Sequence, residues 1–401
     1  MNKLNITDLD VAGKTVFMRV DFNVPQNEDG SVRDDLRIRS ALPSINWVRE
    51  RGGKLVLASH LGRPKKVKDD PAKLALLKMD PIAAHLESLV DGPVVKVDEV
   101  VGPSATAAVQ ALEPGGIVLL ENTRFHAGEE KNDAELSKEM AALCDGIYIS
   151  DAFGTVHRAH ASTEGICHHV PQAAAGFLVA KEMEYFGKVV SHPERPLTAL
   201  LGGAKVADKI TVLDNLLNLV DSLLIGGGMA YTFLKAKGFE IGDSILDQDG
   251  LDVAKRAMDK AGDQGVKLLL PIDVVVADAF SVDAVTKVVD VDQIQPGWQG
   301  LDIGPGTTAA FGDVVQASKT VVWNGPVGVF EMEPYAKGTR TLAELLAGGN
   351  MTSIIGGGDT AAAVTQFGFA DRMSHVSTGG GASLEMLEGK TLPGLAALTD
   401  K

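Results

Sequence analysis

Short apolar runs alternate with longer amphipathic stretches along most of the chain. In the first half, these runs predict strands near residues 15–21, 54–59, 117–121 and 147–150. In the second half, they predict strands near residues 198–201, 222–225, 267–271, 320–323, 353–355 and 375–377. The runs are nearly continuous in apolar residues, which is typical of parallel strands buried on both faces. Because helix-like stretches separate them, the pattern predicts βα units built around parallel sheets.

This alternation is interrupted between residues 180 and 196. Residues 180–186 have a helical pattern, and the segment that follows contains Pro193 and Pro196, which favour a boundary. We therefore predict an α/β protein with two doubly wound, Rossmann-like parallel-sheet domains joined by a helix. The first domain is expected over residues 1–181 and the second over residues 182–385.

The composition narrows the possible functions. The chain has 38 lysines and arginines and 53 aspartates and glutamates. The resulting net charge of −15 argues against nucleic acid or an anionic membrane as partner. No apolar run approaches the roughly 20 residues of a membrane-spanning helix. The first residues lack a secretory signal, and two cysteines are too few for a disulfide scaffold. We therefore expect a cytoplasmic protein.

Arginine and glycine are unevenly distributed. Nine of the 13 arginines precede residue 191, whereas 29 of the 44 glycines follow it. Guanidinium groups bind phosphate or carboxylate through paired N–H donors, and glycine turns let backbone N–H groups approach a phosphate. The two halves thus suggest two ways of binding anions. The same composition would also arise if the arginines were surface residues and the glycines ordinary turn residues. The positions of these residues must therefore decide between this interpretation and anion binding.

Polar side chains in the first half follow the predicted strands, at the sheet edge where open parallel sheets bind ligands. Three arginines and two residues suited to hydroxyl groups occupy these positions: Asp21, Asn23, Arg63, Arg124 and Arg158. His60 lies near one arginine in sequence, and Arg37 lies between the first strand and the next helix. A single arginine is ordinarily a surface residue. Three at strand ends predict a site for a small, hydroxylated, multiply anionic molecule.

Glycine-rich loops take the same positions in the second half. Residues 202–205 (GGAK) are expected to open a helix that carries Lys209, where a phosphate would offset the like charges of Lys205 and Lys209. Further glycine-rich loops follow later strands at residues 226–228, 324–331, 356–360 and 379–383. Asp359 in one of these loops suits a magnesium ion bound together with a substrate phosphate, or the N-cap of the next helix.

Motifs of other protein classes are absent or incomplete. The phosphate-binding pattern G-x-x-x-x-G-K-[ST] does not occur. Residues 304–309 (GPGTTA) fit G-x-G-x-x-A, but no clear strand leads into them, so a dinucleotide site is not favoured. Residues 167–169 (CHH) could combine with His157 and His160 as a metal cluster. The spacing of a zinc site is not met, which favours ordinary loop residues.

Together, the strand-end segments resemble the phosphoglycerate kinase family. The matching stretches are RVDFNVP (19–25), SHLGRP (59–64), ENTRFHAGEEKND (121–133), DAFGTVHRAHAST (151–163), GGAKVADK (202–209), LIGGGMAYTF (224–233), WNGPVGVFE (323–331), GGGDTA (356–361) and STGGGASLE (377–385). Nine stretches in family order make the resemblance very specific. It implies a glycolytic or gluconeogenic kinase that converts 1,3-bisphosphoglycerate and ADP reversibly into 3-phosphoglycerate and ATP. The transfer would be direct and in line, in an interdomain cleft that closes by hinge bending.

The resemblance also implies residue roles. The first domain would bind the phosphoglycerate through Asp21, Phe22, Asn23, Arg37, His60, Leu61, Gly62, Arg63, Arg124 and Arg158. The second would bind ATP or ADP through Lys205, Lys209, Gly300, Asn324, Glu331, Gly357, Gly358, Asp359 and Thr360. Arg37 and Lys205 would contact the transferring group, and Asp359 would hold Mg²⁺. The tail, about 386–401, would return to the first domain of a monomer without nucleic-acid or membrane partners.

Two other interpretations remain open. A nicotinamide-dependent dehydrogenase would need a glycine fingerprint after the first strand, where this chain has DFNVP (21–25). A non-catalytic binding protein of the same fold would be expected to lack Arg37, Lys205 or Asp359, and all three are present. Gly306 stands where lysine is common in the family, which leaves the nucleotide affinity open.

Overall fold

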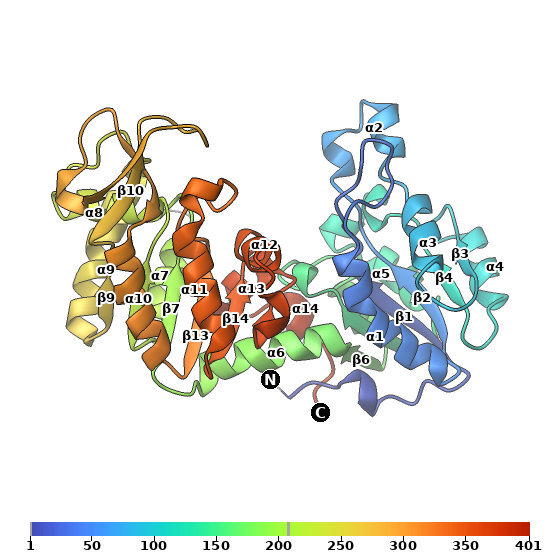
Figure 1. The fold of residues 1–401 in the computed structure, drawn as a ribbon. Helices are drawn as coiled ribbons and strands as arrows, with labels where there is room; N and C mark the ends of the chain where they lie inside the picture. Colours follow the sequence, from blue (N-terminus) through green and yellow to red (C-terminus); the bar gives the residue numbers. More distant parts are fainter. Residues whose placement is uncertain (1, 207–208) are drawn as a thin grey trace. The chain divides into compact units, whose positions relative to one another are not determined.

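The computed structural model describes residues 2–206 and 209–401, which divide into two compact units. Unit 1 comprises the chain up to Glu184 together with Thr391–Lys401, and unit 2 comprises Tyr185–Lys390. Each unit has a parallel sheet flanked by helices (Figure 1). The division between the units falls within helix α6 (Phe177–Ser191).

Within its described residues, unit 1 contains a six-stranded parallel sheet of order β3-β4-β2-β1-β5-β6. The strands are β1 (Thr15–Val20), β2 (Lys54–Ala58), β3 (Val94–Lys96), β4 (Ile117–Leu119), β5 (Ile147–Asp151) and β6 (Gln172–Ala175). The order in which strands are added to the sheet reverses beside β1, because β2 pairs on one side of it and β5 on the other. The carboxyl ends of β4, β2, β1 and β5 are therefore neighbours along one edge, where such sheets bind ligands.

The helices of unit 1 are α1 (Leu36–Glu50), α2 (Pro71–Ala75), α3 (Asp80–Glu87), α4 (Pro103–Gln110), α5 (Ala134–Ala141) and α14 (Pro393–Ala396). The short α2 buries no residue and projects from the unit (Figure 1). Fully buried Met18 of β1, Leu57 of β2 and Ile45 of α1 belong to one hydrophobic core. The C-terminal residues lie in this unit, since Thr399 donates its backbone N–H to the carbonyl of Ala173 in β6 at 2.9 Å.

Unit 2 contains, in its described residues, a six-stranded parallel sheet of order β15-β14-β13-β7-β8-β9. The strands are β7 (Leu197–Leu201), β8 (Ser222–Ile225), β9 (Lys267–Leu269), β13 (Thr320–Asn324), β14 (Thr352–Gly356) and β15 (His375–Val376). The order reverses between β7 and β13, which pair with Thr320 opposite Leu197. The loops after these two strands thus meet at the reversal point that favours ligand binding.

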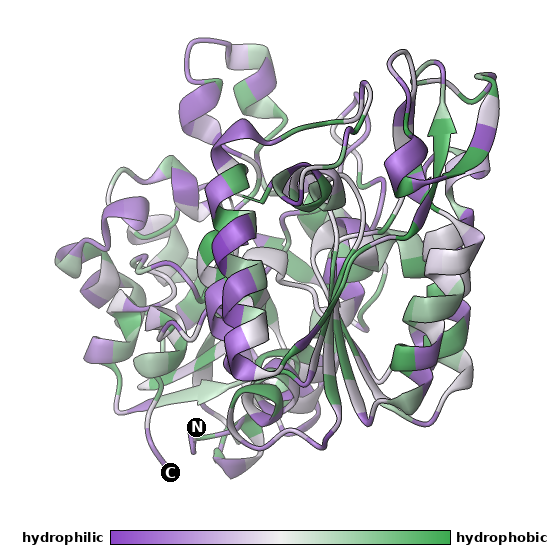
Figure 2. Ribbon diagram, turned by 90° about the vertical axis from the view of Figure 1, so that its left-hand side faces the viewer, coloured by the Kyte–Doolittle hydropathy of each residue, from purple (hydrophilic) through white to green (hydrophobic). Residues whose placement is uncertain are grey.

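Helices flank the unit 2 sheet (Figure 1). They are α7 (Ile210–Leu216), α8 (Met229–Ala236), α9 (Leu251–Gln264), α10 (Pro305–Ala317), α11 (Lys337–Gly348), α12 (Gly358–Gln366) and α13 (Gly380–Leu387). The strands are coloured mainly as hydrophobic in Figure 2, whereas the helices carry both hydrophilic and hydrophobic residues. Trp323 in β13 is fully buried in the core of this unit.

A second, antiparallel sheet in unit 2 was not predicted from the sequence. It has the order β11-β10-β12 and consists of β10 (Asp273–Ala277), β11 (Thr286–Asp290) and β12 (Gln299–Ile303). Alternate residues of β11 are exposed, so this strand lacks a continuous apolar run. β12 leads directly into Gly304 and α10, which corrects the expectation that no strand precedes residues 304–309. Since β12 is antiparallel to its neighbour, the segment still lacks the parallel βαβ setting of a dinucleotide site.

Two short strands of unit 1 were also not predicted. β3 has three residues, of which Val95 is exposed, and β6 reads Gln-Ala-Ala-Ala, a composition with little strand preference. Both become strands because each pairs with a neighbouring strand, β3 with β4 and β6 with β5. Among the helices that the structure describes, none is both long and apolar enough to cross a bilayer.

Candidate functional site

Hydrogen bonds join the loops after β1, β2 and β4 in unit 1. The Asn23 side-chain oxygen accepts from the backbone N–H of Gly62 at 2.8 Å, and the Phe22 N–H donates to Ser59 Oγ at 2.8 Å. The Arg124 guanidinium donates to the Gly62 carbonyl at 2.8 Å. Segments distant in sequence therefore form one polar edge on the sheet.

Arg37 lies in the first turn of α1, and not in the connection before the helix as the sequence suggested. Its NH1 donates to Asp21 Oδ2 at 2.9 Å and to the Asn23 carbonyl at 3.1 Å. A positive charge at a helix N-terminus is opposed by the helix dipole, and the Asp21 carboxylate offsets this. The ion pair directs the guanidinium toward the strand-end loops.

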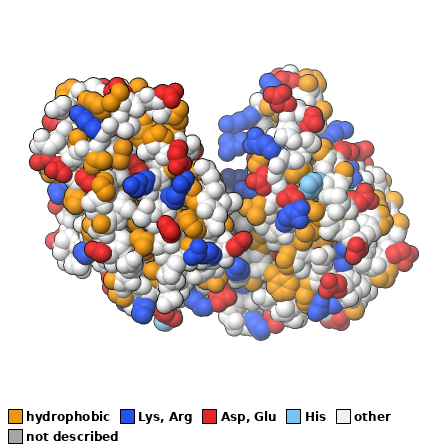
Figure 3. Space-filling model, viewed as in Figure 1, with side chains coloured by type: hydrophobic (Ala, Val, Ile, Leu, Met, Phe, Trp, Pro, Cys, Tyr) orange, Lys and Arg blue, Asp and Glu red, His pale blue; other side chains and the backbone are white. Residues whose placement is uncertain are grey.

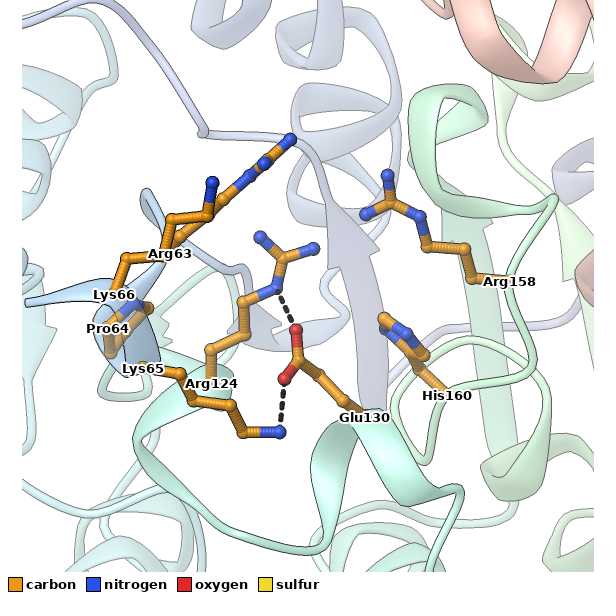
Figure 4. Close-up of a pocket in the computed structure, with 8 residues that line it drawn as sticks. All are labelled: Arg63, Pro64, Lys65, Lys66, Arg124, Glu130, Arg158 and His160. Carbon is orange, nitrogen blue, oxygen red and sulfur yellow. Dashed lines mark ion pairs between the residues drawn. The ribbon is translucent and has the colours of Figure 1, made fainter. Parts of the chain in front are cut away.

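A cavity of about 340 Å³ opens among positively charged side chains of unit 1. Arg63, Arg124, Arg158 and His160 line it together with residues 64–66 and Glu130 (Figure 4). The guanidinium groups of Arg124 and Arg158 reach into the same space from opposite sides. Lys and Arg side chains also gather beside the projecting α2 of this unit (Figure 3). The cavity therefore suits a small anion with several charged groups.

Glu130 supplies a carboxylate to this cationic cavity. It lies 2.5 Å from Lys65 Nζ and 3.5 Å from Arg124 Nε. The hydrogen bond from Lys65 is the main cause that holds the pKa of Glu130 below its ordinary value. Burial, together with the charge of Arg158, lowers the pKa of Arg124. A bound anion would relieve this crowding of positive charge.

Burial separates the predicted residues of unit 1 into two groups. The side chains of Phe22 and Leu61 belong to the hydrophobic core, so only their main-chain atoms could face a ligand. His60 is also buried, and burial followed by the charge of Arg19 holds its pKa well below the ordinary value. Arg63 is exposed on the cavity wall.

In unit 2, the loops after β7, β8 and β13 are hydrogen-bonded to one another. Gly202 N donates to the Asn324 carbonyl at 2.9 Å, and Gly227 N donates to the Val327 carbonyl at 3.1 Å. A Cβ atom on Gly202 would lie only 2.0 Å from the Pro326 carbonyl oxygen. Glycine is therefore required where these loops approach each other.

Asn324, at the end of β13, carries an unsatisfied donor. The side chain is 3% exposed, and its oxygen accepts from Lys209 Nζ at 3.3 Å. Lys209 also donates to the Gly202 carbonyl at 2.6 Å. The Asn324 Nδ2 atom is buried with no acceptor among the described residues, and Gly357 lies beside it. Because a buried donor without a partner is costly, this atom indicates a place for a ligand oxygen.

Helix α12 directs its N-terminus to the same place. Gly357 is its N-cap residue, with a φ of 85°, and Thr360 Oγ1 accepts from Gly325 N at 2.7 Å. Asp359 lies exposed in the first turn, so its alternative role as the N-cap residue is wrong. Helix N-terminal N–H groups, a lysine and a free amide donor form a set suited to phosphate.

Lys205 does not open a helix in the described residues. α7 begins at Ile210 with Lys209 as its N-cap residue, which corrects the expected helix start at residues 202–205. Gly203 has a φ of 100°, and its N–H donates to the Pro326 carbonyl at 3.3 Å. These constraints hold Gly203 away from helical dihedral angles. Lys205 is exposed in the turn that follows.

Gly300 and Glu331 lie on a neighbouring part of unit 2. Gly300 is buried in β12, and the Tyr231 hydroxyl occupies the space where a side chain would begin, 1.9 Å from an ideal Cβ. The Val329 N–H donates to the Leu301 carbonyl at 2.9 Å, which links β12 to the loop that carries the exposed Glu331.

Several residues of the unit 1 site were not singled out from the sequence: Arg19, Lys65, Lys66, Glu130 and His160. His160, which the sequence suggested to be an ordinary loop residue, lines the cavity. Lys65 and Lys66 directly follow Pro64 after Arg63, which was a usable signal. Arg19 is a charged residue within an otherwise apolar strand, a second usable signal. Glu130 has no such signal in the sequence, and its position in the cavity is evident only from the folded structure.

The acidic cluster of Asp80, Asp98 and Glu121 is a less suitable metal site. Lys96 Nζ lies 3.0 Å from Asp80 and 2.8 Å from Glu121, and it also contacts Asp98. The ammonium group thus occupies the position of a cation.

Comparisons with known proteins identify the family of the chain. A family model described as phosphoglycerate kinase matches residues 6–390. The structure is similar to that of phosphoglycerate kinase from Coxiella burnetii, with 41% identity, 98% of each chain covered and a TM-score of 0.89. It is also similar to phosphoglycerate kinase from Pyrococcus horikoshii OT3, with 30% identity, 98% of each chain covered and a TM-score of 0.83. This chain therefore belongs to the phosphoglycerate kinase family of glycolytic kinases.

Proposed function

We propose that unit 1 binds 3-phosphoglycerate or 1,3-bisphosphoglycerate and that unit 2 binds ATP or ADP, between which the enzyme transfers a phosphoryl group. The observation that carries the assignment of unit 1 is its cavity, whose lining includes Arg63, Arg124, Arg158 and His160. Its volume of about 340 Å³ suits a three-carbon acid with one or two phosphates and leaves no room for a nucleotide as well.

Hydroxyl and carboxylate groups of the acid would meet the adjoining polar edge. Asp21 and Asn23 offer oxygen acceptors there, and Arg37 and His60 offer N–H donors. The arginines would bind the phosphate through paired N–H groups. Phe22, Leu61 and Gly62 would contribute backbone atoms, because the first two have buried side chains.

The nucleotide phosphates would lie at the N-terminus of α12 in unit 2. Gly357, Gly358 and Thr360 would supply backbone N–H groups, and Lys209 and the unsatisfied amide of Asn324 would add two further donors. Gly300 and Glu331 would meet the nucleoside, with Glu331 near the ribose hydroxyls. These roles follow the family resemblance, residue by residue.

Asp359 fits a magnesium ion. Its carboxylate is exposed in the first turn of α12, beside the expected phosphates, and Mg²⁺ usually binds one or two carboxylates together with substrate phosphates. When bound, the ion would neutralise part of the charge on the nucleotide.

The reaction requires no general base, because a phosphate oxygen attacks in one direction and a carboxylate in the other. Both are already anionic at neutral pH. The protein must instead position three groups in line and offset the charge of the transferring group. We assign this task to Arg37 and Lys205.

Since different units bind the two substrates, we include hinge-bending closure in the proposal, which would also exclude water from the acyl phosphate. We further propose that the enzyme is a cytoplasmic monomer.

An ATP-forming assay supplied with 1,3-bisphosphoglycerate and Mg-ADP tests the function directly. We expect ATP to appear only when both substrates are present, and omission of Mg²⁺ to abolish the signal. Binding of each substrate without ATP formation would support a non-catalytic protein. Reduction of a nicotinamide cofactor would support a dehydrogenase instead.

A further inference from the structure

A fully buried arginine lies beneath the unit 1 site. Arg19 in β1 is 1% exposed, and a buried charge must be matched by partners to be tolerated. Its Nε donates to Ser162 Oγ at 2.8 Å, its NH1 donates to the Val20 carbonyl, and its NH2 contacts His60 Nδ1 at 3.1 Å. Arg19 therefore contacts the His60 ring from a position that is buried within unit 1.

The carboxylate of Glu129 balances the positive charge of Arg19, and Ser162 links the two side chains by hydrogen bonds. Glu129 is fully buried, and its two carboxylate oxygens accept from the Ser162 hydroxyl at 2.5 Å and from the Ser162 N–H at 3.0 Å. The single hydroxyl proton of Ser162 goes to Glu129, so its oxygen lone pair is available to Arg19. The order of donors is thus defined, from Arg19 through Ser162 to Glu129.

This chain determines which nitrogen of His60 carries the proton. A guanidinium group has only N–H donors, so the Nδ1 atom of His60 must offer its lone pair to Arg19. A neutral imidazole then carries its single proton on Nε2. No residue that the structure describes accepts a hydrogen bond from His60 Nε2, so this proton is available to a ligand.

The surroundings of His60 keep the ring neutral. The side chain is 4% exposed, and burial is the main cause that lowers its pKa well below the ordinary value. The positive charges that face it from β1, the β4 loop, the β5 loop and α1 act in the same direction; they belong to Arg19, Arg124, Arg158 and Arg37. A neutral donor adds a hydrogen bond to the site without adding a further charge to this cluster.

We propose that Glu129, Ser162 and Arg19 form a positioning chain that holds His60 in the Nε2–H tautomer, so that His60 donates a hydrogen bond to an oxygen of the phosphoglycerate. The proposal rests on the proposed function of unit 1. The opposite tautomer would present a lone pair to an anionic ligand and repel it. Arg19, Ser162 and Glu129 are thus positioning residues, which act on the substrate through His60.

Two kinds of variant test this proposal. Ser162→Ala breaks the chain, and Ser137→Ala is its control, because Ser137 is equally buried in unit 1 but bonds only within α5 and its N-cap. His60→Gln and His60→Asn form a second pair. A glutamine amide can donate from the place of Nε2, whereas an asparagine oxygen can accept from Arg19 in the place of Nδ1 but leaves no outward donor.

In the intact enzyme at neutral pH, ¹⁵N NMR of labelled histidine should show His60 with a bare Nδ1 and a protonated Nε2, assigned by the signals lost in His60→Gln. In Ser162→Ala we expect mixed or titrating ring signals and a roughly tenfold higher KM for 3-phosphoglycerate, with the KM for ATP unchanged. Ser137→Ala should change neither. His60→Gln should keep a lower KM for 3-phosphoglycerate than His60→Asn.

Two results would overturn the proposal: a proton on Nδ1 of His60 in the intact enzyme, or Ser162→Ala without any change in ring signals and KM. The NMR signature does not depend on catalysis. An enzyme that fails to form ATP but shows the expected tautomer would therefore refute the proposed function and leave the positioning chain in place.

Discussion

The carboxylate of Glu130 lies 2.5 Å from the Lys65 ammonium group, inside a cavity whose other charged residues are cationic. Its second ion-pair contact is Arg124 Nε, at 3.5 Å. Glu130 thus offsets part of the positive charge that an anionic substrate would meet. Repulsion between Glu130 and a bound phosphate across the partly exposed cavity would be on the order of 1 kcal/mol.

We therefore expect Glu130→Gln to bind 3-phosphoglycerate about threefold to tenfold more tightly in calorimetric titration, because a like charge is removed. Glu135→Gln on the exposed surface of α5 is the control and should leave the affinity unchanged. Weaker binding by Glu130→Gln would show that the carboxylate mainly holds Lys65 and Arg124 in position.

Arg63 tests the assignment of the substrates to separate units. It lies exposed on the wall of the unit 1 cavity. Loss of a charged hydrogen-bond donor in Arg63→Ala should raise the KM for 3-phosphoglycerate by roughly tenfold to hundredfold. A binary titration should show unchanged ADP affinity. Arg51→Ala, at the far end of α1, is the control. An equal loss of affinity for both ligands would contradict the assignment.

Substitution of Lys205 tests whether its side chain stabilises the phosphoryl group during transfer. By comparison with the loss of one oxyanion donor, Lys205→Ala should lower turnover by about 10²- to 10³-fold. Binding of 3-phosphoglycerate to unit 1 should remain intact. Lys255→Ala on the exposed surface of α9 provides a matched control of charge. Near-normal turnover of Lys205→Ala in the ATP-forming assay would remove Lys205 from the catalytic group.

Continuous apolar runs such as β13 were predictable, because a strand buried on both faces needs apolar residues throughout. β11 was not, since its alternating exposure reflects a partner strand that local sequence does not reveal. Likewise, the hydrogen bond of Gly203 to the loop after β13 and its φ of 100° exclude the helix start expected at residues 202–205. Residue types identified the arginines of the site. The approach of Glu130 to Lys65 and the unsatisfied amide of Asn324 depend on segments that meet only in the folded chain.

Two glycines of unit 2, Gly202 and Gly262, differ in the space available for an added side chain. Substituting each by alanine therefore separates the effect of a steric clash from the effect of alanine on helix stability. In Gly202→Ala, the new Cβ would lie 2.0 Å from the Pro326 carbonyl, so the loops after β7 and β13 must separate. We expect lower thermal stability and at least roughly tenfold weaker ADP binding, because the phosphate donors depend on these loops. Gly262→Ala in α9 meets no atom within 4 Å. Because alanine favours helices, it should stabilise the protein by about 0.5–1 kcal/mol. Thermal unfolding and titration of both variants would check the contrast.

Asp151 at the end of β5 makes the stability of unit 1 depend on pH. Its Oδ1 accepts from the backbone N–H groups of Leu178 and Val179 at the start of α6, whereas the buried Oδ2 has no hydrogen-bond partner among the described residues. Burial raises its pKa from 3.8 to about 7. As the pH rises from about 4 to 7, the unfolded chain loses this proton while the folded protein keeps it, so the folded state loses stability across that window.

Asp151→Asn should remove this dependence, because the amide keeps the Oδ1 acceptor and cannot ionise. We expect the Tm difference between the variant and the natural enzyme to shift in favour of the variant by roughly 2–8 °C from pH 5 to pH 8. Asp91→Asn, at an exposed position, is the control. Comparing variants at each pH cancels the opposing contribution of His157, whose pKa burial lowers to about 4. A parallel Tm profile for Asp151→Asn and the natural enzyme would mean that Asp151 is ionised in the folded protein throughout this range.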